Sequence, residues 1–438
     1  MCDYSGRIPT TTDDINVLNN KETDNSGRFS KKVLTHKYHN WTEPLIQGPW
    51  DIGFNESYIT IGGIQSAPFA FLRNSKFQQK DMENIIYWNK GAYRMPFGRS
   101  RIGNDGEGSA DWDSTAYNMI VVNETEKFLH RHMENNPNQP FLTYVALGAV
   151  HVPHSPPNRY IDGSKISGQY ATRHMDLLNE MDKVVGSLIK ILEDKELIED
   201  TIIVFTSDNG GLGRMNGSQK EGHLSSGPLR GSKGSIYEGG HRIPMIIRWD
   251  KGMIPKGESR GQIVGLNDLF ATLCDFCGIE VPKNQASDSV SFADYAKDEN
   301  IGGSRESYNA WRYKRGRLKS TSVNKNGWKL VYNHRKQKSE LFNLLDDVGE
   351  LHDLSGKNRA KVQELLKEMK LSGPCVDEVG NFDVFDKKSN KFDKRNCNWF
   401  KITKRCWFYH EGRLHCGFTC AMEQKRICRK NQDQILVQ

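Results

Sequence analysis

The first candidates for chemistry in this chain are a carboxylate and an amide that stand side by side. Asp208 and Asn209 come just after the apolar run Thr201–Thr206 and just before two glycines. Carboxylate and amide oxygens are hard ligands of the kind that Ca²⁺ or Mg²⁺ prefers. Asp-Asn-Gly-Gly is also good turn sequence. The pattern alone therefore leaves both a metal site and a plain turn open.

A second candidate is Lys233, which lies in a glycine-rich segment that runs from Gly227 to Arg242. Glycines let the backbone approach a bound group closely. A lysine ammonium is a point charge that suits a sulfate or phosphate group. The segment leads directly into a predicted buried strand, so a merely flexible surface loop is the weaker interpretation. We predict that Lys233 binds an anionic group.

The third candidate is His151, which follows the apolar run Phe141–Leu147. An imidazole with a pKa of about 6.5 can protonate a leaving-group oxygen near neutral pH. A single histidine in such a place is more often structural. His151 is therefore a strong candidate for a proton donor only if the other two candidate sites lie near it.

The elements that must position these residues alternate between helical and buried-strand patterns. Apolar residues at helical spacing predict helices, and short apolar runs predict strands. The predicted helices cover residues 113–134, 170–195 and 265–278, and the predicted strands cover residues 141–147, 201–206 and 244–249.

Strands that are apolar on both faces and alternate with helices indicate an α/β fold, with a mostly parallel sheet sandwiched by helices. Ligands of such sheets bind beyond the carboxyl ends of the strands. We therefore expect His151, Asp208, Asn209 and Lys233 to surround one pocket. Oxygen ligands for a metal, a lysine and a histidine in one place would suit hydrolysis of a charged ester.

The pattern changes on both sides of this region. Residues 1–110 show little periodicity and are expected to form long surface loops. Residues 327–332 and 339–344 predict an antiparallel hairpin, and residues 356–370 predict a helix, so a small antiparallel α+β subdomain is expected. The expected parts are an α/β domain over residues 1–300, this subdomain over residues 301–372 and a cysteine-rich tail over residues 375–428.

The tail holds six of the nine cysteines, which indicates a disulfide framework and an oxidising compartment. They are Cys375, Cys397, Cys406, Cys416, Cys420 and Cys428. Four Asn-x-Ser/Thr sequons, at Asn40, Asn55, Asn123 and Asn216, agree with a secreted glycoprotein. Residues 1–20 have no apolar run of the kind found in a signal peptide. We therefore expect further residues upstream.

Charge is distributed unevenly along the chain. From Lys387 onward there are 13 Lys or Arg against 4 Asp or Glu, whereas the rest is nearly neutral. A basic tail suggests contact with a polyanion, although a solvated surface explains it equally well. No apolar run is long enough to predict a membrane span. Nothing in the pattern suggests a nucleic-acid partner.

The motifs together resemble the sulfatases of the alkaline phosphatase superfamily, in order and in spacing, over roughly residues 40–370. The motifs that carry the resemblance are Gly48-Pro-Trp-Asp-Ile-Gly-Phe, Ala67-Pro-Phe-Ala-Phe-Leu-Arg-Asn, Ala149-Val-His-Val-Pro, Phe205-Thr-Ser-Asp-Asn-Gly-Gly, Gly227-Pro-Leu-Arg-Gly-Ser-Lys, Glu238-Gly-Gly-His-Arg-Ile-Pro, Asn267-Asp-Leu-Phe-Ala-Thr-Leu, Trp328-Lys-Leu-Val and Glu340-Leu-Phe-Asn-Leu.

The resemblance implies roles for single residues. Asp208 and Asn209 match a pair of calcium ligands, and Lys233 matches the lysine that holds the sulfate. His151 matches a histidine near the bridging ester oxygen, and His223 a histidine that contacts substrate. Arg230 and Arg242 are expected to be structural.

The resemblance also implies elements ahead of residue 40: a strand that ends in two aspartates, a Cys/Ser-x-Pro-x-Arg sequence whose Cys or Ser becomes the formylglycine nucleophile, and a Lys-x-His pair. Cys2, Cys274 and Cys277 lack the Pro-x-Arg context. We expect the chain to begin after these elements, as an incomplete chain. The alternative is a pseudoenzyme.

The tail resembles the small ShK-toxin-like modules of secreted enzymes, which implies anchoring, glycan binding or a structural cap. The expected function is a calcium-dependent sulfuric ester hydrolase, arylsulfatase-like, that acts on a sulfated carbohydrate or aryl ester. A catalytically inactive binder of sulfated glycans is the alternative. A phosphodiesterase is disfavoured because related enzymes place a histidine where this chain has Asn209. Substrate specificity is expected in the loops 55–110 and 155–168.

Overall fold

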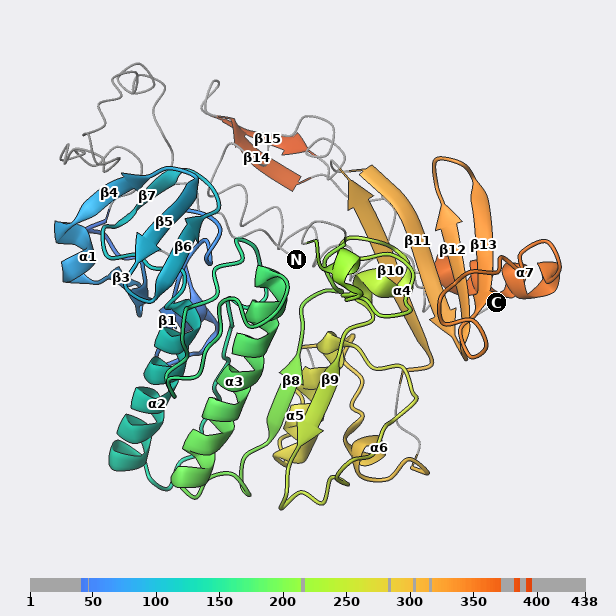
Figure 1. The fold of residues 1–438 in the computed structure, drawn as a ribbon. Coiled ribbons are helices and arrows are strands. Elements are labelled where there is room, and N and C mark those ends of the chain that lie inside the picture. The colour runs from blue at the N-terminus through green and yellow to red at the C-terminus, as the bar shows by residue number, and fades with distance from the viewer. Residues whose placement is uncertain are drawn as a thin grey trace. The chain divides into compact units, whose positions relative to one another are not determined.

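The computed structural model describes residues 41–45, 47–213, 217–282, 285–301, 305–314 and 317–371, together with two short strands (Figure 1). The chain divides into two compact units, which are described here one at a time. The first comprises Met1–Ile198 and Asn216–His223, and the second Glu199–Met215 and Leu224–Gln438. The domain limits expected near residues 300 and 372 stay predictions. The cysteines of the tail lie outside the described residues.

The first unit begins with small antiparallel sheets around an aromatic core. β1 pairs with β2 and β2 with β3, β4 pairs with β7, and β5 pairs with β6. Their bounds, with those of the short helices η2 and α1, are η2 Pro49–Ile52, β1 Tyr58–Ile59, β2 Leu72–Arg73, β3 Lys76–Phe77, α1 Gln79–Glu83, β4 Ile85–Trp88, β5 Gly91–Met95, β6 Gly98–Ile102 and β7 Gly106–Ser109. Phe69, Trp88 and Trp112 are buried between them. The expectation of surface loops was therefore wrong for residues 58–109, because short twisted strands with glycines show no clear period.

Two long helices complete the first unit. α2 covers Tyr117–Asn135 and α3 covers Arg173–Asp194, and they lie side by side. The Thr172 hydroxyl caps α3 by accepting a hydrogen bond from the Met175 amide. Val122, Val184 and Ile191 are buried between the helices. Both predicted helices are confirmed.

The predicted strand over residues 141–147 is not present. Leu142 and Tyr144 are 71% and 81% exposed, and no described segment is hydrogen-bonded to this run as a strand partner. Phe141 and Leu147 still pack against the helix core. The apolar pattern therefore marked side chains of this segment that pack against the helices. It could not show whether another strand lies beside the segment.

The second unit has an antiparallel pair where a parallel sheet was expected. β8 covers Ile203–Thr206 and β9 covers Met245–Arg248, and they pair antiparallel. Among the described residues the only parallel contact is a single bridge between Phe69 and Gly108. The prediction of a mostly parallel sheet is therefore not met in this part of the chain. Among its described residues, the connection from β8 to β9 contains only the short helices η4 (Ser218–Glu221) and α4 (Glu238–His241).

The predicted C-terminal antiparallel sheet is confirmed in the second unit. Its four strands follow chain order, and α7 packs on it over a core that includes Leu330, Leu341 and Leu365. The remaining elements of the unit are η5 Leu266–Asp268, α5 Leu269–Phe276, α6 Ala293–Lys297, β10 Ser307–Lys314, β11 Arg317–Lys325, β12 Trp328–Asn333, β13 Lys338–Asn343, α7 Arg359–Leu371, β14 Phe382–Asp386 and β15 Lys391–Arg395. None of the helices described has the length and apolar content that a membrane crossing requires.

Candidate functional site

The loop after β8 presents Asp208 and Asn209. The Ser207 hydroxyl donates a hydrogen bond to the Asn209 carbonyl over 3.0 Å, which closes the turn. Asp208 is exposed and Asn209 half-buried. No hydrogen bond or ion pair engages the Asp208 carboxylate within the described ranges. Its oxygens are therefore available to a ligand.

Two backbone hydrogen bonds join this loop to the glycine-rich segment that carries Lys233. The Lys233 amide donates to the Gly211 carbonyl over 2.9 Å, and the Gly210 amide donates to the Gly240 carbonyl over 3.1 Å. The side chain of Lys233 is exposed. Three of the five predicted site residues, Asp208, Asn209 and Lys233, thus lie on two loops that are bonded to each other.

Glycine is required where these loops meet. A Cβ atom on Gly210 would lie 2.0 Å from the Gly239 carbonyl oxygen. A Cβ atom on Gly240 would lie 2.2 Å from the Ser235 carbonyl oxygen. Both contacts are with backbone and far inside van der Waals distance, so no side chain fits. These glycines therefore allow the Lys233 segment to approach the Asp208 loop closely. They do not serve to make the segment flexible.

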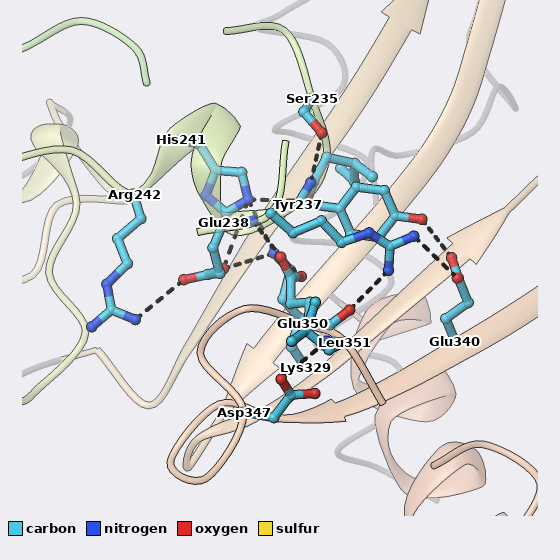
Figure 2. A network of polar contacts seen from close by, with 12 residues as sticks. Ser235, Tyr237, Glu238, His241, Arg242, Lys329, Glu340, Asp347, Glu350 and Leu351 are labelled. Atoms are coloured by element: carbon cyan, nitrogen blue, oxygen red, sulfur yellow. Dashed lines mark hydrogen bonds and ion pairs between the residues drawn. The ribbon is translucent and has the colours of Figure 1, made fainter. Parts of the chain in front are cut away.

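A buried charge cluster holds the end of the Lys233 segment (Figure 2). Lys329 of β12 is fully buried. Its Nζ donates to Glu238 Oε1 over 2.7 Å and lies 3.0 Å from Glu350 Oε1. The Glu238 amide, at the start of α4 (Glu238–His241), donates to Glu350 Oε2 over 2.7 Å. The C-terminal sheet is in this way fastened to the segment that carries Lys233.

The ionisation of the cluster follows from its burial and its one ammonium. Burial raises the pKa of Glu238, but the charge of Lys329 and its hydrogen bond outweigh burial and hold that pKa below its usual range. Burial raises the pKa of Glu350 despite Lys329. Burial and Lys329 both lower the pKa of His241, which is therefore neutral at pH 7. Glu238 is thus the carboxylate that most firmly pairs with Lys329.

The beginning of the segment is held by Arg230. Its guanidinium lies 3.7 Å from the centre of the Tyr237 ring and donates to the Glu350 carbonyl over 3.1 Å. The Tyr237 hydroxyl donates to Glu340 Oε2 over 2.6 Å (Figure 2). These contacts fit the structural role expected for Arg230. Lys233 lies between two anchored ends.

The first unit gathers four histidines. His174 Nδ1 lies 3.3 Å from His154 Nε2, and the rings of His174 and His223 are 5.7 Å apart. His151 is exposed and its Nδ1 lies 2.6 Å from the Val152 carbonyl oxygen. Burial, with repulsion from His174, His151 and Arg101, lowers the pKa of His154 to about 4. Burial and His223 lower the pKa of His174. His154 and His174 are therefore neutral hydrogen-bonding groups at pH 7.

Sequence reasoning missed His154 and His174. His154 could have been found, because it follows His151 at a spacing of three in a proline-rich loop. Nothing in the sequence marks His174, the second residue of α3, which lies near His223 only because of the fold.

A buried polar relay positions the turn that leads to His151. Asn118 of α2 accepts hydrogen bonds from the amides of Gly148 and Ala149 at 2.9 and 3.2 Å. The Asn118 amide group donates to Glu180 Oε1 of α3 over 3.1 Å. Burial raises the pKa of Glu180 to about 8. Glu180 is thus protonated at pH 7, and the relay is neutral.

The five predicted site residues fall in the two units: Asp208, Asn209 and Lys233 in the second, His151 and His223 in the first. One pocket that holds all five stays a prediction. No group of three or more His, Cys, Asp or Glu suited to a metal occurs within the described ranges. Asp208 and Asn209 can therefore supply only part of a calcium shell, which needs six to eight oxygens.

Comparison with known proteins decides the family. The family model described as Sulfatase matches residues 35–279, more than half of the chain. The chain belongs to the sulfatase family. A second model, described as the C-terminal part of N-sulphoglucosamine sulphohydrolase, matches residues 232–372 and so covers the C-terminal sheet of this chain.

The relatives of this chain include sulfatases named for N-acetylgalactosamine. An N-acetylgalactosamine-6-O-sulfatase of Bacteroides thetaiotaomicron is 32% identical over 186 residues, 41% of this chain and 34% of that protein. The N-acetylgalactosamine-6-sulfatase of Sus scrofa is 32% identical over 172 residues, 39% of this chain and 31% of that protein. The matched segments thus span about a third of the length of these relatives.

A solved structure shows the same fold. It is a Bacteroides thetaiotaomicron protein described with the metabolism of multiple glycosaminoglycans, and it covers 77% of this chain and 76% of its own with a TM-score of 0.62. The two are 21% identical. At this identity the likeness supports the alkaline-phosphatase-like fold and nothing finer.

Two short stretches of the sequence have the form of the front elements that the resemblance implies. Lys37-Tyr38-His39 has the form Lys-x-His and lies inside the range that the Sulfatase model matches. That the chain begins after the front elements stays a prediction. These residues lie outside those described.

The sequence Ser155-Pro-Pro-Asn-Arg159 also has the form Ser-x-Pro-x-Arg. Ser155 is 2% exposed and its hydroxyl has no hydrogen-bond partner among the residues described. Arg159 donates to the Gly163 carbonyl over 2.7 Å. A hydroxyl closed off from solvent is not placed to attack a substrate, and this match is structural.

Proposed function

We propose that the protein is a sulfuric ester hydrolase that removes sulfate from a sulfated carbohydrate. The observation that carries the proposal is the bonded pair of loops that presents Lys233 next to Asp208 and Asn209. The exposed Lys233 ammonium can attract a sulfate group. A cation held by the Asp208 carboxylate would offset the repulsion between that carboxylate and the sulfate. The curated relatives with glycan substrates in their names make a carbohydrate the favoured carrier of the sulfate ester.

Calcium is part of the proposal. Asp208 and Asn209 offer two hard oxygen donors, and the acid of the pair is exposed and has no described partner. The residues therefore fit one side of a calcium shell. When bound, the ion would neutralise charge on the sulfate group. Lys233 would bind a sulfate oxygen, and His151 would protonate the departing ester oxygen.

The nucleophile is proposed to be a formylglycine in a segment outside these 438 residues. The structural position of Ser155 supports this view. The 438-residue chain alone is then expected to bind sulfate without turning over an aryl sulfate. The alternative function, a non-catalytic binder of sulfated glycans, uses the same loops and also predicts binding without turnover.

The cysteine-rich tail is proposed to be an ShK-like disulfide module of a secreted glycoprotein. Six clustered cysteines, four sequons and the basic charge of the tail support this. The tail is proposed to contact a polyanion.

The experiment is hydrolysis of 4-methylumbelliferyl sulfate by the whole protein and by the 438-residue chain. We expect the whole protein to be active with Ca²⁺, and K233A to reduce kcat/KM by at least a hundredfold. The matched control K256A changes another exposed lysine of the same unit and should leave the rate unchanged. Activity of the 438-residue chain that S155A abolishes would show that Ser155 is the nucleophile. A whole protein with no activity would favour the glycan-binding alternative.

A further inference from the structure

The outward face of the β5–β6 hairpin is a concentrated positive surface. Arg94 and Arg99 stand directly opposite each other in the antiparallel register, and Arg101 follows Arg99 on the same face. All three are exposed, whereas Ser100 and Ile102 on the other face are buried. The segment from Gly91 to Ile102 contains no acidic residue.

A fourth arginine joins this face from another element. Arg173 is the first residue of α3, and partial burial and repulsion from Arg101 and Arg99 lower its pKa, whereas Asp176 raises it. The Asp176 carboxylate is already bonded to the amides of Gly168 and Tyr170 at 2.8 Å. We name Arg94, Arg99, Arg101 and Arg173 the arginine face.

The arginine face is held in place without being neutralised. The Arg101 backbone is bonded on both sides by the Ser114 hydroxyl at 3.1 Å. None of the four guanidinium groups has an ion pair or hydrogen bond within the described part of the chain. Like charges directly opposite each other weaken a strand pair. A cation at the start of a helix also meets the positive end of the helix dipole. The protein therefore keeps three of these charges, on Arg94, Arg99 and Arg173, in places that cost stability.

The two loops expected to set substrate specificity meet at this face. The Asn158 amide donates to the Phe97 carbonyl over 2.7 Å, and Pro157 bridges to Gly98. His154 of the same loop lies near Arg101 and His174. Neutral imidazoles next to guanidinium groups can bond to sugar hydroxyls while the arginines bind acidic groups.

We propose that the arginine face binds a second anionic group, a carboxylate or a further sulfate, of an acidic oligosaccharide substrate. The choice of an oligosaccharide rests on the proposed function. Arginine guanidinium binds carboxylate and sulfate through paired N–H donors, which suits such groups better than a neutral sugar. The arginine face then selects polymers that carry charge beyond the ester that is cleaved.

The test is binding of a fluorescent chondroitin 6-sulfate tetrasaccharide to the 438-residue chain, against a neutral chitotetraose of equal length. We expect R99Q/R101Q to weaken tetrasaccharide binding at least tenfold while its thermal midpoint is unchanged or higher, because repulsion is relieved. The matched control K80Q/K190Q removes the same charge from exposed sites of the same unit and should bind like the wild type.

Unchanged binding by R99Q/R101Q would overturn the proposal. So would an equal loss in K80Q/K190Q, which would show attraction by net charge alone. Equal or tighter binding of a duplex oligonucleotide or of phosphatidylserine vesicles would assign the face to another polyanion. K233A in the whole protein separates the two proposals. If R99Q/R101Q weakens binding and K233A leaves hydrolysis of 4-methylumbelliferyl sulfate by the whole protein unchanged, the arginine face stands and the assignment of Lys233 falls.

Discussion

The backbone amide of Lys233 is hydrogen-bonded to the carbonyl of Gly211, three residues after Asp208, over 2.9 Å. This bond makes the lysine and the acid parts of one local structure rather than two motifs that share a sequence. This hydrogen bond depends on glycines at positions where a side chain would push the backbone apart. It also depends on the buried charge cluster of Lys329, which anchors the Lys233 segment. Each dependence can be tested separately.

Replacement of Gly240 by alanine should destabilise the second unit. The new Cβ would lie 2.2 Å from the Ser235 carbonyl oxygen, so the backbone must move. We expect a loss of about 1–3 kcal/mol in the free energy of unfolding, measured by urea denaturation. The control is G186A in α3, where nothing lies within 4 Å of the new atom. There alanine should stabilise the helix by up to about 1 kcal/mol. Equal effects from the two substitutions would contradict the close contact.

Replacement of Lys329 by methionine should be far more damaging than loss of a surface lysine. It leaves the Glu238 and Glu350 carboxyl groups buried without their ammonium partner. Removal of one partner of a buried ion pair costs about 3–5 kcal/mol. The control is K325M, whose partner Glu368 is partly exposed, so that only a small loss of stability is expected. The triple variant K329M/E238Q/E350Q should recover part of the loss. If K329M is as stable as K325M, the cluster does not anchor the segment.

Stability should fall as pH rises because of Glu180. Burial raises its pKa from the ordinary value of 4.5 to about 8 in the folded chain. Between these values the folded state binds a proton that the unfolded state releases, so the contribution is complete below about pH 4.5 and is lost as pH rises through 8. E180Q keeps the acceptor for Asn118 and removes the titration. We expect the thermal midpoint of E180Q, relative to the wild type, to rise between pH 5 and pH 8.5. A difference that does not vary with pH would refute a protonated Glu180.

Local sequence patterns predicted the elements that depend on short-range spacing. α2, α3, α5, α7 and the C-terminal hairpin follow from apolar periodicity and were found with small shifts at their ends. The sequence also indicated that the glycine-rich segment around Lys233 is not a flexible surface loop. The reason is that its glycines surround a charged residue and lead directly into a strand. The family resemblance supplied the roles of its residues.

The sequence did not predict features that depend on partners distant in the chain. Leu142 and Tyr144 are apolar in pattern yet exposed, since a strand needs a neighbour that the pattern does not encode. His174 meets His154 only because α3 begins beside the 154–158 loop. The arginines at 94, 99 and 101 were within a loop that showed no period. Only the strand register revealed that they share a face.

The most direct test of the account is the coupling of calcium and sulfate on the 438-residue chain. Binding of inorganic sulfate is measured by calorimetry with and without Ca²⁺, for the wild type, D208A and K233A. We predict that Ca²⁺ tightens sulfate binding at least fivefold, that sulfate tightens Ca²⁺ binding by the same factor, and that either substitution removes this coupling. Sulfate affinity that is independent of Ca²⁺ and unchanged in K233A would contradict a shared site at Asp208, Asn209 and Lys233.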